Sequence, residues 1–349
     1  MPDLTSRFLG CLLGGAVGDA LGAPVEFDTW SEIVADYGRD GIQDYAPGDY
    51  GLGAITDDTQ MTMFTAEGLI RAWVRAELKG SCGVNGVIHH AYLRWLLTQN
   101  ERLPFEVGTD GWLFKCPQLH ARRAPGNTCL SALRAATSNV SSEKALNNSK
   151  GCGGIMRVAP VGLFVLDDHI FKQACEAAAI THGHPTGHLA AGYFAVVIGA
   201  LCRGASLQDA MKLADRHIAE DRDAVEVRNA VHAARALAAR GVPSPQELES
   251  LGGAWIAEEA LAISLCCALV ASDFAHGARL AVNHSGDSDS TGAITGNLLG
   301  AMWGVEAIPR SFLDRLELRR EIERLALDMV NIVEGRTRYE DILDDYPEW

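Results

Sequence analysis

The sequence predicts an all-α protein whose helices surround one core. Three observations support this prediction. Apolar residues recur at helical spacing along most of the chain, alternating β-branched runs are nearly absent, and Gly or Pro residues separate the apolar segments. The most strand-like run, residues 158–165, is short. No linker composition or internal repeat divides the 349 residues, so we expect one domain over 1–349, although length alone would allow two.

The expected elements follow from this pattern in chain order. The small and apolar segment from Arg7 to Gly22 predicts a buried helix that carries one acid, Asp19. Residues 28–55 are rich in Gly, Asp, Tyr and Pro without apolar periodicity, which predicts a long loop over a pocket. A helix then begins after Thr56 and ends at Gly80. Further helices are expected over 87–97, 129–136, 171–180, 189–201, 207–218, 225–237, 256–270 and 312–333.

The net charge, the cysteines and the apolar runs indicate which partners and which cellular compartment to expect. A net charge of −15 argues against a large basic face, so neither nucleic acid nor a membrane surface is an expected partner. The nine cysteines are scattered without a CxxC pair, which is typical of thiols in a reducing compartment. The apolar N-terminal run is interrupted by Asp19, and we expect no later run of membrane-spanning length. The sequence therefore predicts a cytoplasmic protein.

Two acidic clusters lie far apart in the sequence, and each directly precedes a helical pattern. Asp287 and Asp289 stand among Gly and Ser residues, before a helix expected to begin near Thr291, and residues 56–59 read Thr-Asp-Asp-Thr. Ordinary capping explains each cluster alone, with Ser290 as the N-cap of the later helix. Together the clusters resemble two halves of one oxygen-lined site, which is how proteins hold a hard cation.

Three further motifs carry candidate functional groups. Glu26 lies in an apolar stretch, so its carboxyl is either paired or poised for proton transfer. Residues 150–157, KGCGGIMR, form a glycine-rich loop whose amides could approach a pyrophosphate, with glycine needed for helix packing as the alternative. Residues 181–188 offer three histidines without an HExxH pattern, which favours a helix-start turn or a hydrogen-bonded His182 over zinc.

These motifs, in this order and approximate spacing, resemble the ADP-ribosylglycohydrolase family. The segments that carry the resemblance are GAVGDALGAPVEF, TDDTQMTMFTAEGL, KGCGGIMR, THGHPTGH and SGDSDSTGAITGNLLGA. The resemblance implies a compact, mostly orthogonal bundle of helices with a binuclear metal centre at the floor of a cleft. Two Mg²⁺ ions per subunit are implied, with Mn²⁺ as a substitute. By motif position their ligands would be Thr56, Asp57, Asp58, Asp287, Asp289 and Ser290.

The resemblance also implies roles for the remaining motifs. Asp57 or Asp58 would orient or deprotonate the attacking water, and Glu26 would gate access or move a proton. His182 would lie beside the phosphates of an ADP-ribosyl group. The segment that cradles the pyrophosphate and ribose would be Ser149, Gly151, Cys152, Gly153 and Gly154.

The implied reaction is hydrolysis of the bond that links ADP-ribose to a modified protein, with ADP-ribose as product and a monomer as the acting unit. The GCG, RAPGNT and SGDSDST sequences are similar to arginine-directed members, so we expect the N-glycosidic bond to arginine. Alternatives are a hydrolase of O-linked ADP-ribose (serine or O-acetyl) or of another ribosylated or phosphorylated metabolite. A member that binds ADP-ribose without activity, like the crystallins, is a further alternative, against which both intact acidic clusters argue.

Overall fold

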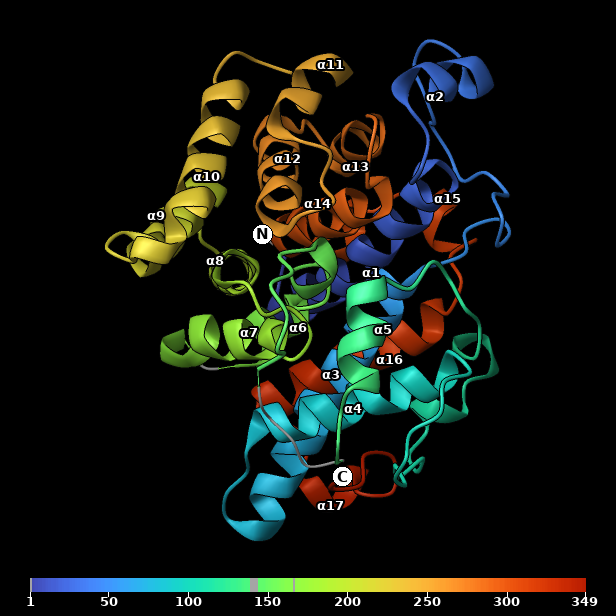
Figure 1. The fold of residues 1–349 in the computed structure, drawn as a ribbon, viewed down its shortest axis with the longest axis vertical. Helices are drawn as coiled ribbons and strands as arrows, with labels where there is room; N and C mark the ends of the chain where they lie inside the picture. Colours follow the sequence, from blue (N-terminus) through green and yellow to red (C-terminus); the bar gives the residue numbers. More distant parts are fainter. Residues whose placement is uncertain (1, 139–143, 166) are drawn as a thin grey trace.

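The computed structural model describes residues 2–138, 144–165 and 167–349, and these residues fold into helices joined by turns and short loops. The described residues contain no β-strand, and a single isolated bridge joins Gly151 to Ile256. The predicted all-α fold is therefore confirmed. Figure 1 shows the helices crossing one another at large angles around two that lie at the centre, α1 and α14.

The helices of the described residues vary from one turn to more than six turns in length. In chain order they are α1 (Leu4–Gly22), α2 (Trp30–Tyr37), α3 (Asp57–Lys79), α4 (Val84–Thr98), α5 (Asn127–Arg134), α6 (Ala159–Phe164), α7 (Ile170–Ala179), α8 (Pro185–Cys202), α9 (Leu207–Ile218), α10 (Val225–Ala238), α11 (Pro245–Leu248), α12 (Ala257–Val270), α13 (Phe274–Val282), α14 (Ser288–Trp303), α15 (Arg310–Leu313), α16 (Arg319–Val333) and α17 (Tyr339–Ile342).

A stripe of glycines lets the backbones of α1 and α14 touch. A Cβ atom on Gly18 would lie 1.9 Å from the carbonyl oxygen of Gly292, and one on Gly14 would lie 2.4 Å from that of Gly296. The glycines recur every four residues, so they share one face of each helix. The two helices run antiparallel, because Gly10 near the start of α1 meets the C-terminal end of α14. The C-terminus of α1 and the N-terminus of α14 are thereby brought together.

Two predicted elements differ from the observed ones. Residues 28–55 are not a continuous loop, because Trp30–Tyr37 forms α2, whose N-terminus is closed by a capping box between Thr29 and Glu32. The strand-like run 158–165 is the short helix α6, with a proline in its first turn and five of its six residues buried. A one-turn helix that is buried on all sides has no amphipathic period, so its sequence is indistinguishable from that of a buried strand.

The predicted helix over 312–333 is interrupted, and α13 was not predicted. The interruption covers residues 314–318, and it ends at Leu318, whose φ of 55° places it in the left-handed region directly before α16. The expectation that no later run reaches membrane-spanning length is also wrong. The later run Pro185–Cys202 has a mean hydropathy of 1.4 over 18 residues. The N-terminal run Leu4–Val25 has a mean hydropathy of 1.5 over its most apolar window. In the structure 89% and 83% of these windows are buried, as in core helices.

Candidate active site

Asp19, near the C-terminus of α1, fixes the start of α3. Its carboxylate accepts hydrogen bonds from the backbone amides of Thr56 and Thr59, each at 3.1 Å, and from the Thr59 hydroxyl. Thr56 is the N-cap of α3, since its hydroxyl accepts the amide of Asp58 at 3.3 Å. Asp19 is fully buried. It therefore satisfies free amides of a helix end and sets the direction in which Asp57 and Asp58 project.

Asp287 forms the start of α14, at the other acidic cluster. It is the N-cap, and its carboxylate accepts the backbone amide of Ser290 at 3.3 Å. The same amide donates to Asp289 at 2.8 Å. The helix thus begins at Ser288 rather than near Thr291, and the N-cap is Asp287 rather than Ser290. The two carboxylates share one helix N-terminus, whose dipole favours negative charge.

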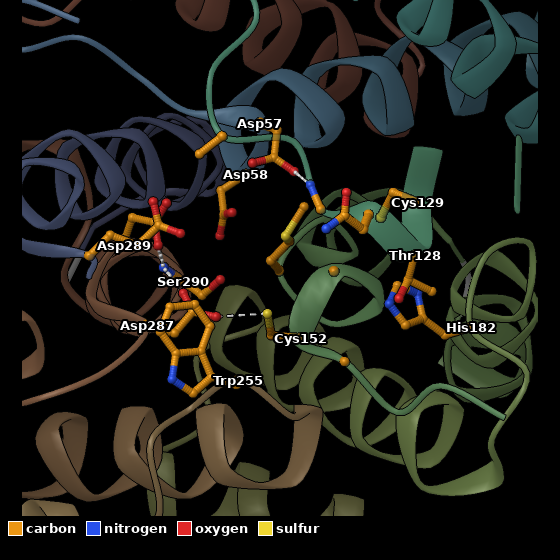
Figure 2. A pocket seen from close by; sticks show the side chains of 17 residues that line it. Asp57, Asp58, Thr128, Cys129, Cys152, His182, Trp255, Asp287, Asp289 and Ser290 are labelled. Atoms are coloured by element: carbon orange, nitrogen blue, oxygen red, sulfur yellow. Dashed lines mark hydrogen bonds between the residues drawn. The ribbon is translucent and has the colours of Figure 1, made fainter. Parts of the chain in front are cut away.

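The two clusters open into one cleft of about 200 Å³. Figure 2 shows Asp57, Asp58, Asp287 and Asp289 on one side of it and His182 on the other, beside Thr128 and Cys129. The residues that line the cleft are Glu26, Asp57, Asp58, Ala124, Gly126, Asn127, Thr128, Cys129, Gly151, Cys152, Gly153, Met156, His182, Trp255, Asp287, Asp289 and Ser290. The predicted site residues Thr56, Ser149 and Gly154 are not among those that line the cleft.

The acidic side of the cleft concentrates negative charge without a neutralising cation. In the part of the chain that the structure describes, none of its carboxylates forms a salt bridge. Burial, followed by the charge of Asp289, raises the pKa of Glu26 to about 11 and that of Asp19 to about 7. The same two causes raise the pKa values of Asp57 and Asp58 well above the ordinary value. Each carboxylate is thus less stable ionised than it would be in water.

The acidic side fits divalent cations. One carboxylate oxygen from each of Glu26, Asp287 and Asp289 lies within 4.8 Å of the other two. The Oδ1 atom of Asp58 is buried and has no hydrogen-bond partner among the residues that the structure describes, although a buried carboxylate oxygen without one is costly. A hard cation would satisfy both features, because it prefers carboxylate oxygens and offsets their repulsion.

The glycine-rich loop forms the opposite wall. Residues Cys152–Gly154 make one 3-10 turn, and the ring of His182 packs against them. A Cβ atom on Gly153 would lie 2.8 Å from the sulfur of Cys129 and 3.0 Å from Cε1 of His182. Glycine is therefore required here for close packing, and the same packing leaves the loop backbone at the surface of the cleft. The thiol of Cys152 crosses to the acidic side and donates to Asp287 at 2.8 Å.

The three histidines of residues 181–188 do not converge on one point. His184 is the N-cap of α8 and accepts the amide of Thr186 at 3.1 Å, while the ring of His188 contacts the carbonyl of His182. His182 alone reaches the cleft. The helix-start turn and the hydrogen-bonded His182 that the sequence favoured over zinc are thus what the structure contains.

An aromatic pair at the cleft was not predicted. Phe27 and Trp255 stack with ring centroids 5.7 Å apart and an interplanar angle of 17°, yet they remain 71% and 45% exposed. Phe27 directly follows Glu26, and Trp255 lines the cleft. Nothing in their spacing could have paired them, because 228 positions separate them in the sequence. Exposed stacked rings at a cleft are suited to contact a ligand.

The chain is similar to several known proteins. The ADP-ribosylglycohydrolase family profile matches residues 1–339. The chain is 28% identical to the ADP-ribosyl-[dinitrogen reductase] glycohydrolase of Rhodospirillum rubrum over 93% of this chain and 95% of that protein. It is 24% identical to the ADP-ribosylarginine hydrolase Tri1 of Serratia proteamaculans (strain 568), over 91% and 77%. A solved structure titled ADP-ribosylglycohydrolase-related protein complex matches with a TM-score of 0.67 and 27% identity, over 95% and 99%.

Proposed function

This chain belongs to the ADP-ribosylglycohydrolase family, and from that premise we propose that it is a metal-dependent hydrolase of ADP-ribosylated proteins that prefers the N-glycosidic bond to arginine. The observation that carries this proposal is the division of one cleft into two chemically different halves. Buried carboxylates without a cation partner form one half, and the glycine-rich loop with His182 forms the other.

The acidic half would hold two Mg²⁺ ions, and Mn²⁺ would suit the same oxygens. The unpartnered oxygen of Asp58 and the convergence of Asp287 with Asp289 support this assignment. When bound, such ions supply the positive charge that keeps these carboxylates ionised and that acidifies water. The residues that would hold them are Thr56, Asp57, Asp58, Asp287, Asp289 and Ser290.

The glycine-rich half would hold the diphosphate. Phosphates are repelled by the carboxylates, so the loop backbone at Gly151 and Gly153 is the surface that suits them. The ribose whose bond is cleaved would then face the acids, because the cleft places the two halves opposite each other. This orientation sets the anomeric carbon beside Asp57 and Asp58.

Proton transfer would fall to carboxylates of this chain. Asp57 or Asp58 would orient and deprotonate the attacking water, because both line the cleft at the start of α3. A neutral guanidine is a poor leaving group, so a proton must also reach it. Glu26, whose pKa is raised by burial and by Asp289, is placed beside the acids and would deliver that proton or gate access. Developing positive charge at the anomeric carbon is stabilised by the carboxylates.

The preference for arginine rests on the charge and the aromatic groups around the reacting centre. The guanidinium group is a planar cation, and it is attracted both to carboxylates and to aromatic faces such as those of Phe27 and Trp255. A serine-linked substrate presents neither a positive charge nor a planar group. The name of the arginine hydrolase from Serratia supports the same preference.

A paired substrate assay tests the proposal. An arginine-ADP-ribosylated protein and a serine-ADP-ribosylated peptide would be incubated separately with the enzyme, with Mg²⁺ or with a chelator, and released ADP-ribose measured. We expect release from the arginine-linked substrate that the chelator abolishes. Release of ADP-ribose from the serine-linked peptide alone would contradict the proposed preference for arginine. Release of phosphate instead of ADP-ribose would contradict the proposed reaction.

A further inference from the structure

Arg157 is a fully buried cation that has no carboxylate partner in the part of the chain that the structure describes. Its Nη1 atom donates to the sulfur atoms of Met61 and Cys129, at 3.7 and 3.4 Å. Its Nη2 atom donates to the carbonyl of Ala177 at 3.2 Å and to the Thr181 hydroxyl at 2.6 Å. All four acceptors are neutral, and Nε has no hydrogen-bond partner among the described residues. A buried charge of this kind is costly unless something else compensates it.

The fold compensates other buried arginines in two ways. Arg7 donates to three carbonyl oxygens at the C-terminal ends of α8 and α14, at 2.8, 2.8 and 3.0 Å. Arg71 and Arg94 both form salt bridges to the buried Glu67, at 2.9 and 2.8 Å. Arg157 instead lies over the ring of Tyr92, with 4.4 Å from its guanidinium carbon to the ring centroid. A cation–π contact attracts a cation but does not neutralise it. The charge of Arg157 therefore remains available to an anion that enters from outside the chain.

The position of Arg157 links it to the glycine-rich half of the cleft. It contacts Cys129, which lines the cleft. The hydroxyl of Thr181 lies between Arg157 and His182, 2.6 Å from Nη2 of the arginine and 2.8 Å from Nδ1 of the histidine. A guanidinium group can only donate, so the Thr181 oxygen is an acceptor and its own proton is free to point toward Nδ1. With the hydroxyl proton in that direction, Nδ1 of His182 is the acceptor and the ring carries its own proton on Nε2.

Electrostatics favour the same tautomer. The cation lies on the Nδ1 side of the ring, and it attracts the lone pair that this tautomer places there. Burial, followed by the charge of Arg157, lowers the pKa of His182 to about 3, so the imidazole is neutral near pH 7. His182 therefore offers a phosphate a single N–H group, and the positive charge on this side of the cleft belongs to Arg157. The Nε2 atom lies 3.2 Å from the position of a Cβ atom on Gly151, at the loop that lines the cleft.

We propose that Arg157 and Thr181 are positioning residues for the diphosphate of ADP-ribose. Arg157 supplies positive charge from behind the cleft wall, and through the Thr181 hydroxyl it holds His182 in the tautomer whose Nε2–H group donates to a phosphate oxygen. This inference rests on the proposed function, because it takes the diphosphate of ADP-ribose as the anion. It also explains how a chain of net charge −15 binds an anion beside a carboxylate cluster.

Substitutions at Thr181 distinguish the effect of the hydrogen-bond relay from Arg157 through Thr181 to His182 from the effect of side-chain packing. Thr181→Val keeps the shape and removes the hydroxyl, and Thr181→Ser restores it. Thr65→Val is the matched control, because Thr65 is likewise fully buried and its hydroxyl bonds Tyr92 at 2.8 Å rather than His182. Two quantities would be measured: the tautomer of His182 in the ligand-free protein, from ¹⁵N shifts of its ring, and the Kd for ADP-ribose by calorimetry.

We expect Thr181→Val to lose the pure Nε2–H signature and to raise the Kd by about ten- to a hundred-fold, as for one lost hydrogen bond to a charged group. Thr181→Ser and Thr65→Val should match the wild type in both readouts. Arg157→Met should raise the Kd further and weaken its dependence on ionic strength. If Arg157→Met does not fold, the Thr181 pair still decides the matter.

Two results would overturn the inference. One is an unchanged His182 tautomer in Thr181→Val, and the other is wild-type affinity for ADP-ribose in that variant. A wild-type protein that does not bind ADP-ribose would overturn the proposed function and the phosphate contact together. In that case the tautomer measurement, made without ligand, would still report whether the Arg157–Thr181–His182 relay exists.

Discussion

The role of each buried aspartate near the start of α3 depends on its hydrogen-bond partners. Asp19 and Asp58 both lie near the start of α3, and both are buried. Asp19 accepts hydrogen bonds from Thr56 and Thr59, which makes it part of the scaffold. Asp58 lines the cleft, and one of its oxygens has no hydrogen-bond partner among the described residues. The same residue type is therefore structural at one position and available to a ligand at the other.

The residue that best separates metal binding from folding is Asp287. Asparagine caps helices about as well as aspartate, so Asp287→Asn should leave the melting temperature of the metal-free protein within a few degrees of wild type. Turnover should fall by about a hundred-fold or more, and calorimetry should show weakened Mg²⁺ binding. A variant with wild-type turnover would contradict the assignment of Asp287 to the metal site.

The raised pKa of Glu26 gives a pH dependence of stability with a definite sign. Below its ordinary pKa of about 4.3, the carboxyl is protonated in the folded and unfolded chains, and it costs nothing. Above that pH the unfolded chain ionises while the folded one keeps its proton up to about pH 11, so folding becomes less favourable as pH rises. Glu26→Gln cannot ionise. In the presence of a chelator, the free energy of unfolding of Glu26→Gln minus that of the wild type should therefore increase from pH 4.5 to pH 7.

Urea unfolding at these two pH values measures this difference. Taking the difference between variant and wild type removes the contribution of buried histidines such as His89 and His182, whose lowered pKa values act in the opposite direction over part of the range. Saturating Mg²⁺ at pH 7 should stabilise the wild type. A variant whose advantage shrinks as the pH rises would contradict the placement of Glu26 among the acids.

At the scale of elements, the contact between α1 and α14 controls the geometry of the cleft. Gly18→Ala would place a methyl group 1.9 Å from a backbone oxygen of α14, and backbone cannot yield as a side chain can. We expect a loss of about 2 kcal/mol or more in the free energy of unfolding, together with weaker Mg²⁺ binding, because the helix ends move apart.

A second glycine provides the control for this substitution. Gly86 lies within α4, and a Cβ atom there would meet nothing within 4 Å. Gly86→Ala should therefore stabilise the protein by about 0.5–1 kcal/mol through helix propensity alone. Urea unfolding of both variants gives the comparison. Equal effects of the two substitutions would show that the α1–α14 contact is looser than described.

The aromatic pair joins the turn after α1 to the segment before α12. Trp255→Ala should raise KM for an arginine-ADP-ribosylated substrate by about five-fold, as for one cation–π contact, while inhibition by free ADP-ribose stays unchanged. Steady-state kinetics with ADP-ribose as product inhibitor measure both. An equal loss in both would place Trp255 at the ADP-ribosyl group rather than at the acceptor.

The sequence predicted the elements of this site better than their assembly. The helix that follows Thr56 was evident from the sequence, and both acidic clusters stood out before helix starts, although α14 begins three residues earlier than expected and so includes Asp289. The helix α2 was missed although Thr29 and Glu32 form a readable capping box, because its composition is that of a loop. The pairing of Phe27 with Trp255 depends on contacts between distant segments, which no spacing along the chain reveals.

For the whole molecule, charge is segregated rather than balanced. The chain has a net charge of −15, yet it keeps the isolated Arg157 in its interior behind the glycine-rich loop. The carboxylates gather on the opposite side of the same cleft. A substrate that carries a diphosphate at one end and a cationic guanidinium group at the other matches this division. The glycine contact between α1 and α14 is what brings the acidic side together.

The central claim is that two acidic clusters, distant in sequence, share divalent ions in one cleft. Anomalous diffraction from crystals soaked in Mn²⁺ tests it most directly, because the metal is located without reference to activity. The account predicts two anomalous peaks in the cleft, contacted by Asp57 or Asp58 from one cluster and by Asp287 or Asp289 from the other. The absence of any peak, or peaks held by one cluster alone, would contradict it.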